Sequence, residues 1–436
     1  MENLTCIPLQ QSMACSKSAK NMVDVFSNVP DTVIDKILEK LPIRMAAQTS
    51  VLSKQWERSW LSLIRLSFDS DFHEEHKNED GSCNWQESSR IISRILLRHN
   101  GLVHHFNLYV PDHAIGDQMN LNQWISFLSK NGVQTIRINN SDHAMYITSC
   151  IFRCSELVYL ELANFSLNPP PTYFHGFTKL KHLELISINF SEQNIFCSLV
   201  EKCRMLVTLK LVECTGMDHV VIDTPRLETL ILIGYFESLV FRNNVVSLTS
   251  ISLDLTTMPE QITVETFDSI NLLASSCKLE SIKFDGYSCQ FLAAGSGMRS
   301  RPPSVTFNHL DELYLGGLNL SEFAEFRYLL SMIKSCPNIK KLDISILPIP
   351  WEIKYDQPIL ELDYNYKLDH LYEVNIEGII GSSEELRLVI YLLAISTVLK
   401  NVFFKSVNCH TESQLEMYYV LLESQRASSK ARVLFL

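Results

Sequence analysis

Three stretches of the chain share one pattern: LVYLEL at residues 157–162, LKHLEL at residues 180–185 and LVTLKL at residues 206–211. In each stretch the first, fourth and sixth residues are apolar, whereas the third and fifth carry polar groups. The same apolar spacing occurs eleven times, at intervals of 21 to 32 residues, with first residues Val133, Leu157, Leu180, Leu206, Leu227, Leu248, Leu279, Leu310, Ile339, Leu371 and Leu399. A period of about 20 to 50 residues is typical of a repeat protein rather than of one compact core.

The last two apolar residues of each hexad alternate as in a β-strand, so their side chains point to one side and the residues beside them point to the other. One such repeat is too small to bury its own apolar face. We therefore expect the strands to stack into one parallel sheet whose two ends are capped. Apolar residues from Ile91 to Leu97 at helical spacing, and then alternation through Leu108 and Val110, predict the N-terminal cap.

This pattern resembles the leucine-rich-repeat family in its irregular intracellular form, from about residue 121 to 347 and onward. The resemblance implies an α/β solenoid with a parallel sheet on the concave side and with helices and loops on the convex side. Members of the family usually have Asn or Cys three residues after the third apolar position, and Cys214 fits that place. Asn164, Asn189 and Asn319 fall one residue early or late.

A different pattern precedes the repeats. Pro30 and Asp31 are typical of a helix start, and an apolar stripe about 140 degrees wide then predicts a helix that Pro42 ends. A second short helix is expected from Arg44 to Val51. Ser53 can cap a third, which carries both tryptophans of this segment on one face. A segment this short buries so little surface that it needs a partner.

The sequence DVFSNVPDTVIDKILEKLPIRMAAQTSVLSKQWERSWLSL, from Asp24 to Leu63, resembles a plant F-box, with Val29 in place of the more usual Leu and Gln55 in place of Arg. The resemblance implies binding to a Skp-type adaptor, and through it to cullin and RING subunits. The residues expected to bind the adaptor are Val29, Pro30, Ile34, Ile37, Leu38, Leu41, Pro42, Val51, Trp56 and Trp60. For any one of them, holding the module together is an alternative role.

The C-terminal region keeps the strand pattern at Leu371 and Leu399, with a helical stretch between. It resembles the FBD domain of many plant F-box proteins, in Val374-Asn375-Ile376, Gly381, Glu385-Leu386 and Arg426 to Ala431. We thus expect a disordered N-terminal segment (1–23), the F-box (24–69), an acidic linker (70–90), the leucine-rich-repeat solenoid (91–355) and an FBD domain (356–436) that continues the solenoid. The polar stretch from Asp69 to Gly81 is expected to form a mobile loop.

The composition limits the partners. Charged residues make up 20% of the 436 residues, and the formal net charge is -11 with no run of basic residues. This balance argues against binding to a nucleic acid or an anionic membrane. The stretch from Leu388 to Leu399 is shorter than the roughly 20 residues of a membrane-spanning helix, and residues 1–20 have no apolar region typical of a secretory signal. We expect the protein in the nucleus, the cytoplasm or both.

The sequence offers no chemistry of an active site. None of the twelve cysteines has a CxxC spacing, and Cys154, Cys203, Cys277 and Cys336 lie two or three residues before a hexad, where small buried side chains are expected. The ligand-like run from His73 to His76 lies in a polar stretch. Because P-loop, GxSxG and HExxH motifs are also missing, we expect no cofactor, no metal and no catalytic residue.

Strand alternation also predicts where a target protein binds. Most residues on the outer face of the sheet are polar, but Ile186, Val212, Ile231 and Ile233 should form an apolar patch on neighbouring strands. They are either a recognition surface or part of a core that a loop covers. The resemblance implies a substrate-recognition subunit of a Skp-cullin-F-box ubiquitin ligase without catalytic activity. A scaffold that sequesters the adaptor is the alternative.

Overall fold

The computed structural model describes residues 26, 29–74, 78, 83–111, 118–141, 145–242, 245–258, 278–295, 306–347, 361–406 and 412–435. The chain divides into two compact units, unit 1 (Met1–Leu63) and unit 2 (Ile64–Leu436). The segment 1–23, which is predicted to be disordered, and Cys277 lie outside the described residues.

Unit 1 consists of short helices: α1 (Asp31–Leu38), α2 (Ile43–Gln48), the 3-10 turn η2 (Thr49–Val51) and α3 (Lys54–Trp60). The expected helix starts are confirmed, since α1 follows Pro30 and the Ser53 hydroxyl accepts the backbone N–H of Trp56 at the start of α3. Such a cap satisfies one of the orphan N–H groups at the helix start.

Three hydrogen bonds join the N-terminal part of unit 1 to α3. The side chain of Gln55 donates to the carbonyl of Val29 at 3.0 Å and to the Asp31 carboxylate at 2.7 Å. The indole of Trp56 donates to the carbonyl of Phe26 at 3.0 Å. The three bonds bridge 24 to 30 residues of sequence, so they fix the fold of the unit rather than one helix.

The described part of unit 2 contains one parallel sheet of fourteen strands, in which sequence order is also spatial order apart from four short strands that lie outside it. Its members are β1 (Arg65–Phe68), β2 (His105–Val110), β3 (Thr135–Asn140), β4 (Tyr159–Ala163), β6 (His182–Ile186), β8 (Thr208–Val212), β10 (Thr229–Gly234), β12 (Ser250–Leu255), β13 (Ser281–Gly286), β14 (Glu312–Leu318), β15 (Lys341–Ile346), β16 (Glu373–Ile379), β17 (Asn401–Ser406) and β18 (Arg432–Phe435). All eleven predicted hexads lie at strands of this sheet, which confirms the repeat.

The apolar residues of the hexads stack in register. Leu160 is opposite Leu183, which is opposite Leu209, and the third apolar residues pair in the same way from strand to strand. Each of these side chains is almost fully buried. Burial of one Leu contributes roughly 1.5 to 3 kcal/mol, so two such ladders along the sheet supply much of the stabilisation.

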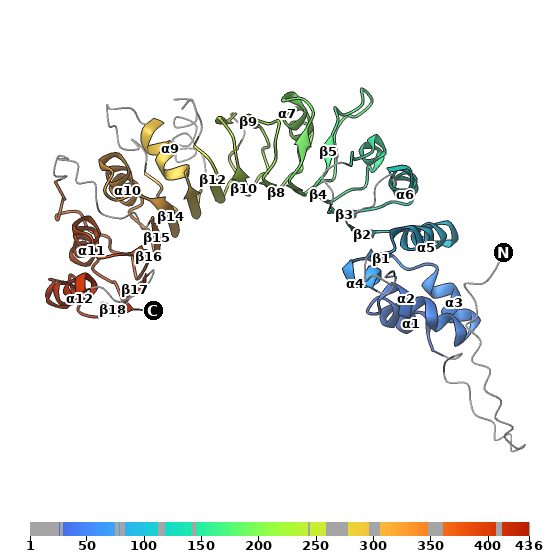
Figure 1. Ribbon diagram of the computed structural model, residues 1–436, viewed down its shortest axis with the longest axis horizontal. Helices are drawn as coiled ribbons and strands as arrows, with labels where there is room; N and C mark the ends of the chain where they lie inside the picture. Colours follow the sequence, from blue (N-terminus) through green and yellow to red (C-terminus); the bar gives the residue numbers. More distant parts are fainter. Residues whose placement is uncertain are drawn as a thin grey trace, which may run out of the picture. The chain divides into compact units, whose positions relative to one another are not determined.

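Helices and short strands connect successive strands of the sheet and cover the face on which the apolar hexad side chains are buried. They are α5 (Trp85–Arg98), α6 (Gln118–Lys130), the 3-10 turn η3 (Ser149–Arg153), α7 (Asn194–Val200), α9 (Ser288–Gly295), α10 (Phe323–Ser335), α11 (Ser383–Ile395) and α12 (Glu412–Glu423), with two-stranded sheets β5 (Ser166–Leu167) with β7 (Asn189–Phe190) and β9 (His219–Ile222) with β11 (Ser238–Phe241). Figure 1 shows the main strands of unit 2 along the inner side of a curved stack and these helices on its outer side.

The start of unit 2 differs from the expected linker at 70–90. Arg65–Phe68, expected in the F-box, pair with β2 instead, and α4 (Ser70–Glu74) forms where a mobile loop is predicted. Phe72 and His73 are buried, with rings 5.1 Å from Phe68 and 5.7 Å from Trp85 respectively. The mobile-loop prediction is therefore wrong for α4, because these aromatic contacts offset the many charges of the segment. The next helix, α5, begins within the expected linker at Trp85.

The C-terminal repeats continue the same sheet. Strands β16, β17 and β18 pair in sequence after β15, and α11 and α12 lie between them. Ser382 and Glu385 form a capping box at the start of α11, and the Glu385 carboxylate also accepts the N–H groups of Ile380 and Gly381. These bonds anchor the loop between β16 and α11.

A recurrent turn precedes many strands. The first apolar residue of a hexad donates its N–H to the carbonyl three residues earlier, as Leu157 does to Cys154 and Leu206 to Cys203. Both thiols are buried, and this burial raises the pKa of Cys154 to about 12 and that of Cys203 to about 11. The predicted role as core filler is confirmed for these two and for Cys336, which is also buried.

The ladder can be tested at Leu209, a buried residue in the middle of the sheet. We expect Leu209→Ala to lower the free energy of unfolding by about 2 to 5 kcal/mol, because it leaves a cavity between three rungs. The adjacent change Lys210→Ala, on the opposite face, should cost at most about 1 kcal/mol. Chemical denaturation followed by circular dichroism measures both. Equal losses would contradict the assignment of the buried face.

Candidate functional site

The residues of unit 1 that are expected to bind an adaptor differ in their burial. Ile34, Leu38, Trp56 and Trp60 are buried, so they hold the module together. Val29 and Leu41 are partly exposed, whereas the accessible members are Pro30, Ile37, Pro42 and Val51. Spacing explains the division, because Ile34 and Leu38 are one helical turn apart on the inner face of α1 and Ile37 lies at its flank.

Val33 and Met45 are among the apolar residues of unit 1 that are exposed and were not predicted as contacts. The exposed fraction is 43% for Val33 and 50% for Met45, compared with 40% for Ile37 and 87% for Val51. Val33 is one helical turn before Ile37, so the two share the outer flank of the stripe on α1. Four large apolar side chains in contact with water on so small a module indicate an interaction surface.

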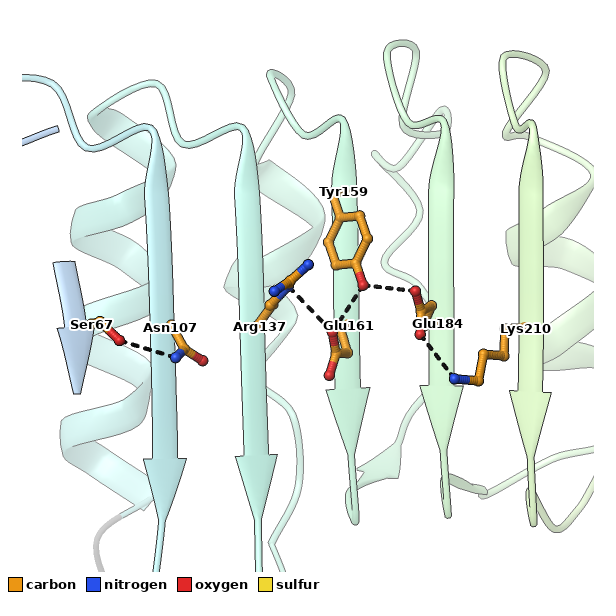
Figure 2. A network of polar contacts seen from close by, with 7 residues as sticks. All are labelled: Ser67, Asn107, Arg137, Tyr159, Glu161, Glu184 and Lys210. Atoms are coloured by element: carbon orange, nitrogen blue, oxygen red, sulfur yellow. Dashed lines mark hydrogen bonds and ion pairs between the residues drawn. The ribbon is translucent and has the colours of Figure 1, made fainter. Parts of the chain in front are cut away.

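The second candidate surface is the concave face of the sheet in unit 2. Residues between the second and third apolar positions form one row across the strands, and their register follows directly from the parallel pairing. From β3 to β8 this row reads Arg137, Glu161, Glu184 and Lys210. Figure 2 shows these side chains together with Tyr159 on one face of the sheet.

A network of polar contacts neutralises this part of the face (Figure 2). The guanidinium of Arg137 lies 3.3 Å from the Glu161 carboxylate, and the ammonium of Lys210 lies 3.3 Å from that of Glu184. The Tyr159 hydroxyl lies 2.9 Å from Glu161 and 2.7 Å from Glu184, so it can donate to either carboxylate. Arg137 also covers the Tyr159 ring at 4.6 Å from its centroid.

The hydrogen bonds and charges around Tyr159 change the pKa of its hydroxyl group. Partial burial, hydrogen bonds to the two carboxylates and their negative charges together raise the pKa of Tyr159 well above its ordinary value. The folded state therefore holds the phenolic proton more tightly than the unfolded chain does. This stabilising contribution is complete below pH 10, the ordinary pKa, and is lost as the pH rises through the folded pKa.

The predicted apolar patch lies next to this network. Ile186, Val212 and Ile233 are direct cross-strand neighbours on β6, β8 and β10. Ile231 is two residues before Ile233, in the row that contains Lys210 and Ser252. All four are partly exposed, neither sealed in the core nor fully in water. We call these four residues the apolar patch.

Carboxylates border the other side of the apolar patch. Asp254 is the cross-strand neighbour of Ile233, and Asp285 is the neighbour of Asp254. Partial burial and then the charge of Asp285 raise the pKa of Asp254 above its ordinary value, and Glu213 adds to the effect. Lys283 lies 3.5 Å from the Asp285 carboxylate and opposes this shift at Asp254. Sequence alternation could have revealed this acidic border, since all three acids lie at outward positions or strand ends.

An open cavity of about 230 Å³ lies on the helical side of unit 2 beside α7 and β9, and the residues that line it include Glu201, His219, Asp223 and Arg242. Its mixed charges select no particular ligand. Within the described ranges, no group of three or more His, Cys, Asp or Glu residues could hold a metal ion. The same part of the chain has no helix long and apolar enough to cross a membrane.

Known proteins resemble this chain over nearly its whole length. The family model described as FBD-associated F-box protein At5g56370, LRR repeats, matches residues 121–273. The F-box/FBD/LRR-repeat protein At1g13570 of Arabidopsis thaliana is 30% identical over 422 residues, which cover 95% of this chain and 98% of the relative. The FBD-associated F-box protein At4g10400 of the same plant is 24% identical, and the match covers 95% and 100%.

Among solved structures, the leucine-rich repeat-containing protein LegL7 from Legionella pneumophila aligns with 75% of this chain and 93% of its own. The TM-score is 0.29 and the sequence identity is 11%, which is too low to support an argument about this chain.

The raised pKa of Tyr159 gives a prediction about alkaline stability. We expect the difference in unfolding free energy between the wild type and Tyr159→Phe to shrink as the pH rises above 10, because only the wild type loses the contribution of the protonated phenol. The variant Glu184→Gln removes one negative charge and should lower the pKa of Tyr159 toward its ordinary value. Chemical denaturation at each pH measures the unfolding free energies, and ultraviolet absorbance titration of the phenolate, with Tyr159→Phe as the reference, measures the pKa of Tyr159. Ionisation of Tyr159 near pH 10 in the wild type would contradict the network.

Proposed function

Because the chain belongs to the plant F-box/FBD/leucine-rich-repeat family, we propose that it is the substrate-recognition subunit of a Skp-cullin-F-box ubiquitin ligase. Unit 1 binds a Skp-type adaptor, and the adaptor joins the chain to cullin and RING subunits. The concave face of unit 2 binds the target protein. The chain itself is not an enzyme in this proposal, because the conjugating enzyme recruited by the RING subunit supplies the chemistry.

The observation that carries the proposal is the exposed apolar surface of unit 1. Val33, Ile37, Met45 and Val51 remain accessible although the unit buries Ile34, Leu38 and both tryptophans. Each large apolar side chain moved out of water contributes roughly 1.5 to 3 kcal/mol, so covering this set would drive association. An adaptor helix or groove of matching apolar character is the partner that the family resemblance suggests.

The apolar patch of unit 2 supports a separate target site. It lies on the sheet face that the helices leave uncovered, between a charge-neutralised network and an acidic border. A rigid stacked sheet holds these side chains at fixed spacings, which favours recognition without a large ordering cost. The described cysteines are all free thiols, which supports a reducing compartment, the nucleus or the cytoplasm.

Reconstitution tests this function. The purified chain is mixed with a Skp-type adaptor, cullin and RING subunits, and the stable complex is isolated by size-exclusion chromatography. Ubiquitin transfer is then measured on proteins that the chain captures in cells under proteasome inhibition. Assembly followed by transfer supports the proposal. Adaptor binding without cullin assembly or transfer would instead identify a scaffold that sequesters the adaptor.

One substitution in α1 separates adaptor contact from folding. We expect Ile37→Glu to weaken binding to a Skp-type adaptor by about tenfold or more, because it places a charge in an apolar contact. Thr32→Glu adds the same carboxylate at another exposed position of α1, about 140 degrees around the helix at about 100 degrees per residue, and should change affinity little.

Isothermal titration calorimetry gives the affinities, and circular dichroism checks the helices. Equal affinity of the wild type and Ile37→Glu would remove Ile37 from the contact. Trp56→Ala is the folding control, since loss of this buried ring should unfold unit 1 and leave the β-sheet signal of unit 2.

A further inference from the structure

The two borders of the apolar patch differ in charge balance. On the β6 and β8 side, Glu184 is paired with Lys210 and also accepts from Tyr159, so its charge is compensated within the chain. On the β12 and β13 side, Asp254 and Asp285 are direct neighbours, Lys283 acts on both, and Asp285 also accepts a hydrogen bond from the Tyr314 hydroxyl. Negative charge therefore exceeds positive charge on one side only.

Glu213, at the end of β8, adds a third negative charge to the border formed by Asp254 and Asp285. Its backbone has a positive φ of 51 degrees, and its N–H donates to the carbonyl of Ile233 at 2.7 Å, which turns the chain beside the apolar patch. Glu213 is exposed and its charge acts on Asp254. Three carboxylates thus face one ammonium group at this border, a local excess of two negative charges.

Like charges directly opposite each other weaken a sheet, so the Asp254 and Asp285 pair costs stability in the free protein. A cation from a partner would offset this repulsion. The apolar side chains of the adjacent strands also reduce the local water content, which strengthens an ion pair formed there relative to one in bulk solvent.

Resting on the proposed function, we propose that the apolar patch together with Asp254 and Asp285 is the docking site for one class of target segment: aliphatic or aromatic residues with Lys or Arg nearby in the sequence. The row from Ile186 through Val212, Ile233 and Asp254 to Asp285 is continuous across five strands. Strands are about 4.8 Å apart, so the centre of the apolar patch on β8 lies about 10 Å from Asp254.

That distance sets the spacing in the partner. An extended peptide advances about 3.3 Å per residue, so a basic residue about three positions from an apolar anchor would reach the acidic border. The one-sided excess charge fixes the border at which the basic residue lies, because the opposite border at Glu184 already has its own cation. A segment with Glu or Asp at the basic position would meet repulsion.

The test uses the purified full chain, with and without a Skp-type adaptor, and a display library of random short peptides. We expect enrichment of peptides with apolar residues about three positions from Lys or Arg. An enriched peptide is then synthesised with a fluorescent label in three forms: unchanged, with its basic residues replaced by Glu, and with its apolar residues replaced by Ser. Only the unchanged form should bind tightly in fluorescence anisotropy.

Variants of the chain identify the site. The double change Asp254→Asn with Asp285→Asn should weaken binding at least about tenfold and reduce its salt dependence. Asp343→Asn is the matched control, because Asp343 lies on the same face and is paired with Lys341 away from the apolar patch. It should leave affinity unchanged. The double change Ile231→Ser with Ile233→Ser should abolish binding while thermal stability stays within a few degrees.

Several outcomes would overturn the proposal. They are a library that enriches nothing or enriches acidic peptides, an Asp254 and Asp285 variant with wild-type affinity, or a large fall in melting temperature for the Ile231 and Ile233 variant, which would assign these residues to packing. Adaptor binding is measured on the same preparations. Selective peptide binding without adaptor binding would reject the ubiquitin-ligase role alone, and the reverse result would reject this docking site alone.

Discussion

Each repeat of unit 2 has an apolar face that only the neighbouring repeats can cover. The ladders that contain Leu160, Leu183 and Leu209 meet this constraint by placing equivalent residues at the same height in successive strands. Parallel pairing follows from it, since every strand must run in the same direction for the ladder to continue. The helices and short strands on the other side complete the core, so the opposite face of the sheet stays free for other molecules.

This division of faces separates stability from recognition. Changes on the inward side alter the core that all repeats share, whereas the outward side can vary in charge and shape at small cost. The network around Tyr159 and the acidic border at Asp254 are built on strands with the same inward pattern. A solenoid can thus carry different binding surfaces without a change of fold, and the sheet supplies fixed spacing between them.

Unit 1 has a different constraint, because it is too short to bury all of its apolar side chains. It is short, and its core rests on a few residues such as Ile34, Leu38 and Trp56, with hydrogen bonds from Gln55 and Trp56 closing the fold. The bonds of Gln55 to Val29 and Asp31 show that this residue, unusual for the family pattern, contributes a polar link of its own. Apolar residues beyond those the core needs remain exposed, which is the feature expected of a module that associates with another protein.

The sequence by itself determined the repeat, the parallel sheet and the helix starts of unit 1. Its apolar period specifies which side of each strand is buried, and Pro30 and Ser53 specify local helix ends. It also located the apolar patch, because alternation alone places Ile186, Val212 and Ile233 on one face. These features depend on residues close together in the chain, where spacing fixes direction.

Only the tertiary structure decided which residues have neighbours from distant segments. It turned Ile34 inward and Ile37 outward on one continuous stripe, and it buried Phe72 and His73 against Phe68 and Trp85 in a stretch whose charges predict a loop. It also showed that the charge of Glu184 is compensated and that the pair of Asp254 and Asp285 keeps an excess. The physical reason is that burial and charge balance depend on distances between strands and helices that local spacing does not contain.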